Sequence, residues 1–398
     1  MKLEIPRFTE RFGAVSLNSV QKVYELDSGA KQEVYQPPQT IRKVETDEVE
    51  NMEINLAIVI PIKNEKLKIF EGVLSGIPHD CFNIIVSNSD RSPVDNFKME
   101  RNAVQQYNKF VGRNSIIIHQ KDSGLGEILK ELGYSDMLDN GTVRSGKGES
   151  MIIGMLLAKM VGKEYVGFID ADNYVPGAVN EYVKIFASSF VMANTPYTMS
   201  RISWVYKPKV SEAGGLSFPK WGRISEYTNN YLNSLISHHT GFETDICKTG
   251  NSGEHAMSMK LAELLTYTSG FAIEPYEMMN IFEEFGGLSR NAPNEALDKG
   301  VEIFQVETRN PHFHEEKGEG HLREMLLCSL SSIYNSSICP KPLKDKILME
   351  LRNNANLGLE EEPPQLHKIG PFKFLDIHAF EKMLREKSST MTEFYPTR

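Results

Sequence analysis

The sequence predicts an α/β fold built around a doubly wound, mostly parallel β-sheet. The first observation behind this prediction is a set of short apolar runs rich in β-branched residues, which comprises Leu56–Ile60, Ile84–Val86, Ile116–Ile118 and Tyr165–Ile169. The second is that stretches with helical periodicity separate these runs. Because the runs are continuously apolar, they are typical of parallel strands that helices cover on both faces.

The elements suggest three regions along the chain. Residues 1–53 form an N-terminal extension in which we expect short strands, because Lys22–Leu26 alternates polar and apolar residues. Residues 54–320 carry the sheet and form the main domain. Residues 321–398 form a C-terminal helical subdomain, since helical periodicity recurs at His321–Ser332, Pro342–Arg352 and Asp376–Lys387.

Within the main domain, Gly124–Leu138 and Ser150–Val161 lie between the third and fourth strands, and the second is predicted to be an apolar helix. A further helix is predicted from Pro176 through Phe186. Beyond Ala193 the pattern loosens into polar loops that hold Trp204, Trp221 and Arg223. A further strand is predicted over Val301–Glu307. Gly250–His255 is expected to cap a helix over Ala256–Leu265, and a substrate-binding role for the same residues is compatible with that cap.

Composition narrows the class of protein. The chain has 398 residues, with 44 Lys and Arg against 53 Asp and Glu, so its formal net charge is −9. This acidity argues against a nucleic-acid-binding surface or an anionic-membrane surface, but it allows a local basic pocket for phosphates. The four cysteines form no CxxC pair, and Met1–Glu10 lacks the apolar segment of a secretory signal. We therefore expect a soluble, cytoplasmic protein.

Polar residues follow each of the four predicted strands. In open α/β sheets, ligands bind outside the carboxyl ends of the strands. The residues found there are Pro61–Glu65, Ser87–Asp90, Lys121–Gly124 and Asp170–Asp172. These segments are therefore the first candidates for a functional site.

Asp170-Ala171-Asp172 places two carboxylates at positions i and i+2 directly after a buried strand. Such oxygen-rich sites suit Mg²⁺ or Mn²⁺ bound together with a diphosphate. Taken alone, the motif is more often a solvated turn with a helix cap. Its position beside three other polar strand ends favours the metal-binding interpretation.

A second segment, Arg144–Glu149, combines two cations with two glycines, which allow a phosphate to approach the backbone while Lys147 neutralises its charge. The alternative is a solvated loop that enters a helix. The segment does not fit the G-x-x-x-x-G-K-[ST] pattern, so a P-loop nucleotidase is disfavoured.

Two further segments are candidates for binding. His312 and His314 lie in a polar loop after the predicted Val301–Glu307 strand, where one imidazole could join a cation held by the two aspartates. Single histidines are more often structural. Trp221–Glu226 offers a guanidinium, a glycine and a hydroxyl, which suit a phosphate or carboxylate, although a loop with a salt bridge would look the same.

In this order, Pro61–Glu65, Lys147–Glu149, Asp170–Asp172, Trp221–Glu226, Gly253-Glu254 and Arg309–His314 resemble the motifs of retaining glycosyltransferases with the GT-A fold. More closely, the chain resembles the mannosyl-3-phosphoglycerate synthase family. The resemblance implies transfer of mannose from GDP-mannose to 3-phosphoglycerate, with Mg²⁺ or another divalent cation such as Mn²⁺ or Co²⁺. It implies no nucleic-acid or membrane partner, and it leaves a homodimer open.

The resemblance also implies residue roles. The guanosine part would be held by Pro61, Lys63, Glu65, Ser87 and Asn88. Lys147 would contact the diphosphate or the sugar, Asp172 with Asp170 would bind the metal, and Glu254 would lie near the transferred sugar. His314 is our preferred additional metal ligand, with His312 as the alternative. The acceptor would be held by Gly222, Arg223 and Ser225, with Asn251 and Arg144 as further contacts.

Three alternatives remain open on the sequence. A glucosyl-3-phosphoglycerate synthase would have the same phosphate and metal motifs. A nucleotidyltransferase would normally have a glycine-rich stretch after the first strand, and Pro61–Glu65 has none. The third is a nucleotide-sugar-binding protein without turnover, against which Lys147, Asp170 and Asp172 count. Since no paired nucleophile and acid are evident, a front-face displacement fits the retaining reaction better than a glycosidase-like mechanism.

Overall fold

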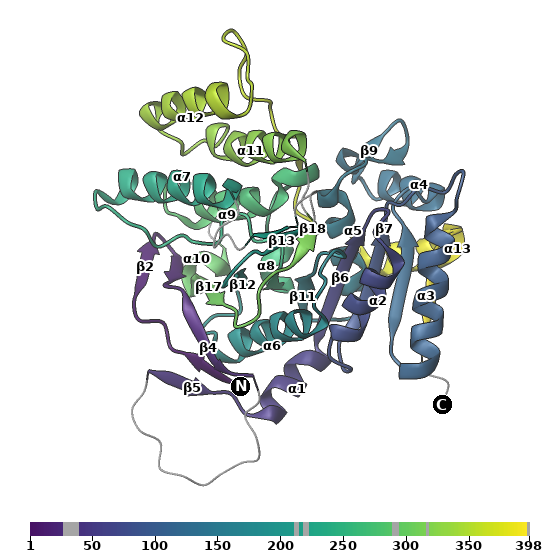
Figure 1. Cartoon of the computed structure of the whole chain (residues 1–398). Helices are drawn as coiled ribbons and strands as arrows, with labels where there is room; N and C mark the ends of the chain where they lie inside the picture. The colour runs from purple at the N-terminus through teal and green to yellow at the C-terminus, as the bar shows by residue number, and fades with distance from the viewer. Residues whose placement is uncertain (27–39, 211–214, 218–222, 289–293, 316–317, 396–398) are drawn as a thin grey trace.

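The structure is a computed structural model that describes residues 1–26, 40–210, 215–217, 223–288, 294–315 and 318–395. In these residues, one sheet contains 13 strands and dominates the fold (Figure 1). Its central strands are β6 (Leu56–Ile62), β7 (Phe82–Ser87), β8 (Ser115–His119), β11 (Tyr165–Phe168), β12 (Thr198–Ser203), β15 (His255–Ser258) and β17 (Val301–Glu307). Its outer strands are β1 (Lys2–Glu4), β2 (Thr9–Phe12), β3 (Val15–Asn18), β4 (Gln21–Glu25), β5 (Ile41–Lys43) and β20 (Thr392–Phe394).

The strand order is β20-β8-β7-β6-β11-β15-β12-β17-β4-β1-β5, with β2 and β3 attached beside β17. Strands β8, β7, β6 and β11 are parallel to one another, and β12 is parallel to β17. Strand β15 is antiparallel to both of its neighbours, β11 and β12. Consequently β12 and β17 point in the same direction as β11, and the predicted mostly parallel α/β sheet is confirmed.

The two faces of the sheet bury different side chains because successive residues of a strand point to opposite faces. In β6, Ala57 and Val59 belong to one apolar cluster, and Ile58 and Ile60 belong to the other. Helix α5 (Lys147–Met160) packs on the first face, where a Cβ at Gly154 would lie 2.3 Å from the Val59 side chain. The glycine therefore lets α5 approach the sheet closely.

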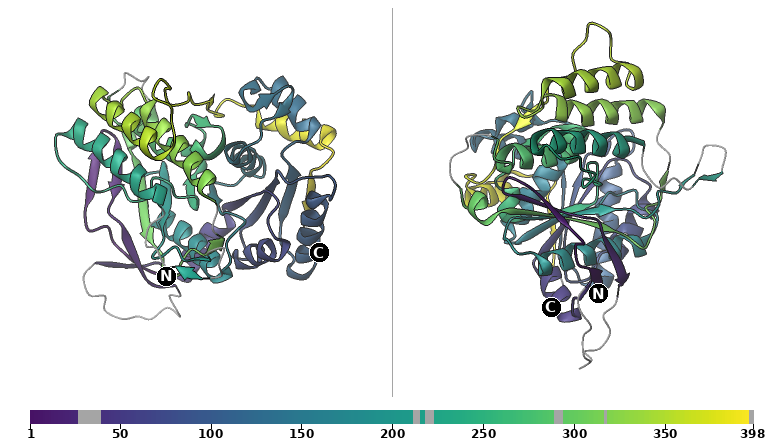
Figure 2. Two further views of the ribbon diagram at one scale, coloured as in Figure 1. Left: turned by 45° about the horizontal axis from the view of Figure 1, so that its top comes forward. Right: turned by 90° about the vertical axis from the view of Figure 1, so that its left-hand side faces the viewer.

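Helices cover both faces, as Figure 2 shows. The second cluster includes apolar residues of α2 (Leu67–Gly76) and α6 (Pro176–Met192), and α1 (Thr46–Ile54) packs on α6. The remaining longer helices are α3 (Asn96–Val111), α4 (Ser123–Glu131), α7 (Arg223–Thr240), α9 (Ile273–Phe285), α11 (Glu319–Tyr334), α12 (Lys341–Asn354) and α13 (Ile377–Lys387). Short ones are α8 (Met259–Ala262), α10 (Glu295–Lys299), η1 (Ser135–Met137) and η2 (Gly270–Ala272).

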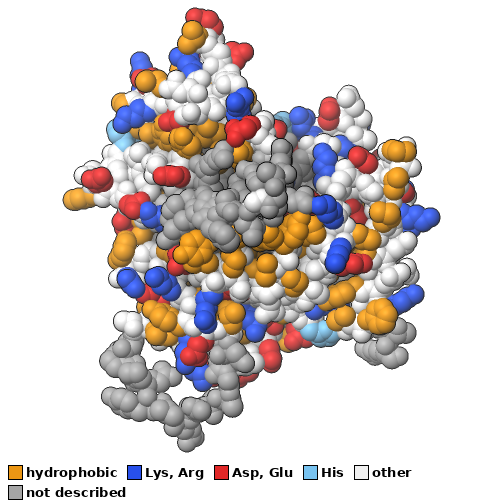
Figure 3. All heavy atoms as spheres, in the orientation of Figure 1, with side chains coloured by type: hydrophobic (Ala, Val, Ile, Leu, Met, Phe, Trp, Pro, Cys, Tyr) orange, Lys and Arg blue, Asp and Glu red, His pale blue; other side chains and the backbone are white. Residues whose placement is uncertain are grey.

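Three small sheets complete the structure. They pair β9 (Leu138–Asp139) with β10 (Thr142–Val143), β13 (Lys209–Val210) with β14 (Leu216–Ser217) and β18 (His314–Glu315), and β16 (Tyr267–Thr268) with β19 (Lys368–Ile369). In the space-filling view of Figure 3, acidic and basic side chains are interspersed over the face shown. No helix among the described residues combines the length and apolar character needed to span a membrane.

The segment around β20 pairs with the edge of the main sheet. Strand β20 pairs antiparallel with β8, and the preceding residues donate hydrogen bonds to the Asp122 carboxylate. The Thr390 hydroxyl lies 2.6 Å from Asp122 Oδ2. The segment after the C-terminal helices thus belongs to the same sheet as the first strands, which the helical periodicity of that region does not predict.

Some predicted elements were wrong. Ala256–Leu265 is not a helix: its beginning lies in β15, and only the four-residue α8 follows. The region that was expected to consist of polar loops contains β12 and the 18-residue helix α7. The helix from Pro176 continues to Met192 rather than ending at Phe186. In each case burial against the rest of the fold decides the structure, which local propensity does not capture.

Candidate active site

One edge of the sheet gathers the candidate residues. The carboxyl ends of β6, β7, β11, β12 and β17 lie at this edge, since these strands are parallel in the sheet. Because β15 runs in the opposite direction, its amino end lies there too. Glu254, which immediately precedes β15, is thereby brought beside Asp170–Asp172, which follow β11. The antiparallel strand therefore supplies a residue that the sequence pattern placed before a helix.

Lys147 forms the centre of the charged group at this edge. It is the first residue of α5, and its Nζ atom lies 2.6 Å from Asp170 Oδ1 and 2.7 Å from Glu274 Oε1. Burial by itself disfavours the ammonium ion, but the two carboxylates outweigh it and raise the pKa of Lys147 above its usual value. The Lys147 side chain is therefore partly buried and remains protonated.

Gly253 allows this group to be compact. A Cβ atom at this position would lie 2.7 Å from Asp170 Oδ2 and 3.3 Å from Lys147 Nζ. Because glycine has no side chain, the backbone at this position can lie directly against the Asp170 carboxylate and the Lys147 ammonium.

Asn173 links two further candidate residues. Its amide nitrogen donates to Glu254 Oε1 at 2.9 Å and to the Asp170 carbonyl oxygen at 2.9 Å. Its amide oxygen lies 2.9 Å from His312 Nδ1. With the amide nitrogen already donating, the oxygen must accept, so the His312 ring donates from Nδ1.

The surroundings of His312 are aromatic and basic. Its ring lies 4.9 Å from the Trp204 ring, centroid to centroid, and the Lys207 ammonium lies 3.6 Å from the centroid of a Trp204 ring. These residues follow β12, whereas His312 follows β17. The two neighbouring parallel strands thus bring a cation and an imidazole to the same edge as Asp170.

Glu254 has an unusual acidity. Burial, followed by the negative charge of Asp170, raises the pKa of Glu254 to about 8, although the Asn173 amide and Lys147 act in the opposite direction. Glu254 therefore holds its proton more firmly than an exposed glutamate does. Perturbed acidity at a strand-end site is typical of functional residues, although structural networks perturb pKa values as well.

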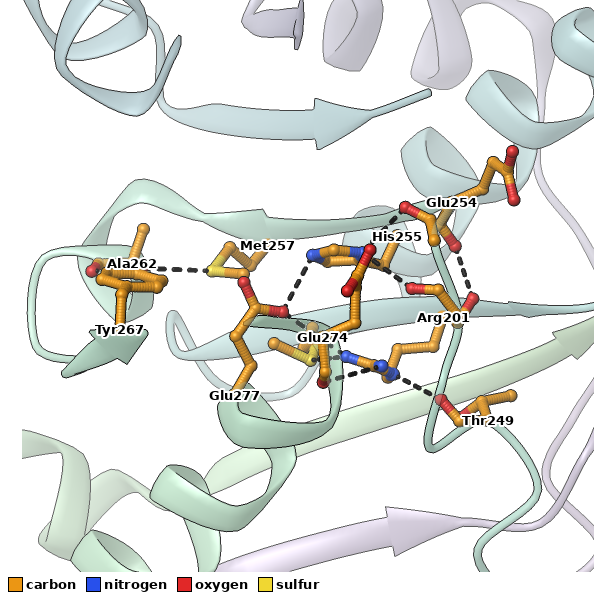
Figure 4. Close-up of polar contacts among 12 residues, drawn as sticks. Arg201, Thr249, Glu254, His255, Met257, Ala262, Tyr267, Glu274 and Glu277 are labelled. Atoms are coloured by element: carbon orange, nitrogen blue, oxygen red, sulfur yellow. Dashed lines mark hydrogen bonds and ion pairs between the residues drawn. The ribbon is translucent and has the colours of Figure 1, made fainter. Parts of the chain in front are cut away.

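A buried network centred on Arg201 connects the segment before Glu254 with the first turn of α9, which carries Glu274 (Figure 4). The guanidinium of Arg201, which is fully buried, donates to the Thr249 carbonyl oxygen at 2.9 Å and to the Glu274 carbonyl oxygen at 3.2 Å. Arg201 also forms an ion pair with Glu277, and Glu277 Oε2 lies 2.9 Å from His255 Nε2. The segment before Glu254 and the first turn of α9 are thus joined through one side chain.

The residues predicted to hold the nucleotide lie at the ends of β6 and β7. Lys63 is exposed, whereas Pro61 and Glu65 are half-buried. Ser87 is buried, and its hydroxyl donates to Glu100 Oε2 at 2.6 Å, so this hydroxyl has a structural partner already. The backbone N–H of Asn88 donates to the Ile62 carbonyl oxygen. The five predicted residues therefore lie at one end of two adjacent strands.

The residues predicted to hold the acceptor are described only in part. Gly222 lies outside the described residues, and of Arg223 the structure describes the backbone as the start of α7. Ser225 is buried in the first turn of α7. Asn251 donates to Ser329 Oγ at 2.6 Å, and its buried Oδ1 has no hydrogen-bond partner among the described residues.

The last acceptor candidate, Arg144, is half-buried, and its carbonyl oxygen accepts a hydrogen bond from Gln120 at 2.6 Å. Arg144 precedes Gly146, the residue before α5, by two positions, which places its backbone near Lys147 along the chain. The side chain of His314 lies outside the description, so the choice between His312 and His314 as metal ligand stays a prediction.

The donor set suits a divalent cation that shares its coordination with a substrate. The described residues contain no cluster of three or more His, Cys, Asp or Glu side chains placed to hold a metal ion. Mg²⁺ is commonly bound by one or two carboxylates together with water and substrate phosphates, and does not need an all-protein cage. The two carboxylates of Asp170 and Asp172, which follow β11, fit that mode.

Asn173, Arg201 and Glu274 were missed by the sequence analysis. Asn173 directly follows the Asp170-Ala171-Asp172 motif, so its position after the strand was the available signal. Arg201 lies in a region that was expected to consist of polar loops, and Glu274 lies in a largely apolar segment of ordinary appearance. Only the fold reveals that Glu274 contacts Lys147 and that Arg201 contacts the backbone that leads to Glu254.

Comparisons with known proteins identify the family. A family model described as mannosyl-3-phosphoglycerate synthase matches residues 5–384. A protein of that name from Pyrococcus furiosus is 47% identical over 396 residues, covering 99% of this chain and 100% of the relative. Another from Aeropyrum pernix is 38% identical over 392 residues, covering 98% and 99%.

Solved structures show the same fold. A glucosyl-3-phosphoglycerate synthase from Mycobacterium tuberculosis, in complex with Mn²⁺, uridine diphosphate and phosphoglyceric acid, has a TM-score of 0.51. It is 16% identical, and the match covers 85% of this chain and 96% of that one. This likeness supports the predicted GT-A architecture. Together with the full-length sequence matches, these findings show that the chain belongs to the mannosyl-3-phosphoglycerate synthase family.

Proposed function

We propose that the protein transfers mannose from GDP-mannose to 3-phosphoglycerate with retention, forming mannosyl-3-phosphoglycerate and GDP. The observation that carries this proposal is the ion pair of Lys147 with Asp170 at the carboxyl edge of the sheet, with the buried Glu254 side chain nearby. Relatives with this named activity match the chain over its whole length. The Lys147 ammonium beside Asp170 and the nearby Asp172 is suited to a nucleotide diphosphate bound through a divalent metal ion.

The residues at this edge are best suited to stabilising the departing diphosphate. A divalent cation, when bound at Asp170 and Asp172, supplies positive charge that stabilises the leaving group. Mn²⁺ or Mg²⁺ is present in related-fold glucosyl-3-phosphoglycerate synthase structures, which supports a divalent cation here. Lys147 is a preorganised cation that needs no reorientation when negative charge develops on the diphosphate.

The two substrates would meet at the edge between β6 and α7. Pro61, Lys63, Glu65, Ser87 and Asn88 are proposed to hold the guanosine part from the ends of β6 and β7. The acceptor phosphate is proposed to bind at the first turn of α7, since helix amino termini attract anions and Arg223 and Ser225 lie there. Gly222, Asn251 and Arg144 remain further proposed contacts.

The transferred sugar would lie between these two regions, close to Glu254. Asn173 keeps the Glu254 carboxyl group in one orientation, and the Glu254 side chain is almost completely buried. In a front-face displacement, the leaving phosphate takes the proton of the attacking acceptor hydroxyl. The chain would then contribute orientation of the acceptor and stabilisation of charge rather than a covalent nucleophile.

A product assay tests the proposal. The protein is incubated with Mg²⁺, 3-phosphoglycerate and, in separate reactions, GDP-mannose, GDP-glucose, UDP-glucose and UDP-mannose, and products are detected by mass spectrometry. We expect a phosphorylated mannoside with GDP-mannose and none after EDTA treatment. Preferential use of a glucose donor would instead establish the glucosyl alternative, which the related fold supports distantly. Binding of a nucleotide sugar without any product would show a binding protein.

A further inference from the structure

Glu274 gives Lys147 a second carboxylate partner that the proposed function does not use. The Lys147 ammonium lies at nearly equal distances from Asp170 and Glu274, 2.6 Å and 2.7 Å. We propose that Glu274 is a positioning residue that retains Lys147 in the site when a divalent cation takes the Asp170 carboxylate. This inference rests on the proposed function, because it assumes a cation at Asp170.

The charge balance around Lys147 requires an anionic partner that stays in place when a cation binds. The Lys147 side chain is 17% exposed, so the ammonium is poorly solvated and needs an anionic partner. A divalent cation at Asp170 would neutralise that carboxylate and repel the ammonium. If Asp170 were its sole partner, binding of the cation would leave Lys147 as an uncompensated, partly buried charge. Competition between Lys147 and the cation for Asp170 would then weaken cation binding.

Glu274 is placed to remove this competition. Its side chain is 9% exposed, against 30% for Asp170, so water screens its contact with Lys147 less. Glu274 also comes from a different element, the first turn of α9, and does not follow β11. Its contact with Lys147 can therefore persist while the Asp170 side chain turns toward a cation.

Arg201 holds the backbone of Glu274 in position. The Glu274 carbonyl oxygen accepts a hydrogen bond from Arg201, and Arg201 also binds the Thr249 carbonyl oxygen (Figure 4). The backbone that carries Glu274 is thus tied to the segment that leads to Glu254. A purely structural role is the alternative, because an acidic residue in the first turn of a helix stabilises that helix through its dipole.

A double-mutant cycle distinguishes the two roles. Binding of Mn²⁺ in the presence of GDP is measured by electron paramagnetic resonance of the free ion, so that turnover is not needed. The four proteins are the parent, Glu274→Gln, Lys147→Met and the double variant. We expect Glu274→Gln to weaken Mn²⁺ binding on the order of tenfold in the parent and less than about twofold in the Lys147→Met background.

A matched control removes a similar pair elsewhere on the same helix. Lys159 lies on α5 and pairs with Glu263 at 3.1 Å, with side chains 18% and 23% exposed. Glu263→Gln should leave Mn²⁺ binding unchanged. Glu274→Asp keeps the charge but shortens the side chain, so it should restore only part of the Mn²⁺ affinity. Should Glu274→Gln unfold, the same cycle is run with Glu274→Asp.

The outcomes separate this inference from the proposed function. An equal loss of Mn²⁺ affinity in the parent and in the Lys147→Met background would show that Glu274 does not act through Lys147, and would overturn the inference. Unchanged Mn²⁺ affinity in Glu274→Gln, or a parent protein that binds no Mn²⁺ with GDP, would overturn it as well. The proposed function fails separately, if the parent protein forms no mannoside in the product assay.

Discussion

The amide nitrogen of Asn173 lies 2.9 Å from Glu254 Oε1, although the two residues belong to segments that are far apart in the sequence. The same amide group accepts a hydrogen bond from His312 through its oxygen. One buried side chain therefore orients a carboxyl group and sets the tautomer of an imidazole. Asn173 is 1% exposed, so both contacts are made away from bulk solvent.

Replacing Asn173 by Ala should impair transfer strongly. The hydrogen bond from Asn173 lowers the pKa of Glu254, so its loss should raise that pKa further and leave the carboxyl group without orientation. Leaving the buried Glu254 carboxyl group without this hydrogen bond costs about 1–3 kcal/mol, which corresponds to a loss of about fivefold to a hundredfold in kcat/KM. Steady-state kinetics with each substrate varied in turn measure this loss in kcat/KM.

Asn280→Ala is the matched control for this change. Asn280 is also buried, and its Oδ1 accepts a hydrogen bond from the Thr266 backbone, away from Glu254. This variant should lower the unfolding temperature while the properly folded fraction keeps parental kcat/KM. Parental kinetics in Asn173→Ala would refute the role assigned to Asn173.

A methyl group at Gly253 should disturb the site without unfolding the protein. The added Cβ of Gly253→Ala would lie 2.7 Å from Asp170 Oδ2, closer than an ordinary contact allows. The carboxylate must then move, so we expect a raised metal requirement and a kcat/KM lowered on the order of tenfold or more. Activity is measured as a function of Mg²⁺ concentration.

Gly177→Ala serves as its control, because a Cβ at Gly177 would meet no atom within 4 Å. Gly177 lies in the first turn of α6, where alanine has the better helix propensity. We expect parental kinetics and equal or slightly higher stability. If both alanine variants show the same metal dependence, the close approach at Gly253 has no role in the site.

Arg223 should affect the acceptor selectively. If its guanidinium binds the phosphate of 3-phosphoglycerate from the start of α7, Arg223→Ala should raise the acceptor KM and reduce kcat/KM about tenfold to a hundredfold. Binding of GDP-mannose, measured by calorimetry, should be nearly unchanged. Arg223→Lys should recover part of the loss, since a lysine lacks the second parallel hydrogen bond. Equal weakening of donor and acceptor would point to a structural role.

Glu53 on α1 should make stability depend on pH. Burial is the main cause that raises the pKa of Glu53 to about 7, and its Oε1 has no hydrogen-bond partner among the described residues. Because the folded pKa exceeds the unfolded value, this group's contribution to stability is complete below pH 4.5 and is lost as the pH rises through about 7.

Glu53→Gln removes the buried charge and is therefore expected to stabilise the protein at pH 8 but not at pH 4.5. The difference between the two pKa values corresponds to about 3 kcal/mol, which is an upper limit because the unfolded chain and local relaxation reduce it. Urea unfolding at both pH values measures the free energy of unfolding. A stabilisation that is the same at both pH values would contradict the assigned pKa.

The sequence by itself determined the α/β class and the strands β6, β7, β8 and β11. Their apolar runs are continuous and rich in β-branched residues, so the local pattern favours buried parallel strands. The same pattern located Asp170 and Asp172 at a strand end, and the family motifs indicated Lys147 and Glu254. These features depend on residues that are close together in the chain.

Only the tertiary structure decided how these residues meet. Strand β15 is four residues long, too short for its periodicity to distinguish a strand from a helix, yet its antiparallel insertion between β11 and β12 places Glu254 beside Asp170. The contact of Glu274 with Lys147 likewise depends on how α9 packs near the start of α5. The physical reason is that sheet order and helix packing follow from burial summed over the whole chain, whereas a local pattern records only which face of an element is apolar.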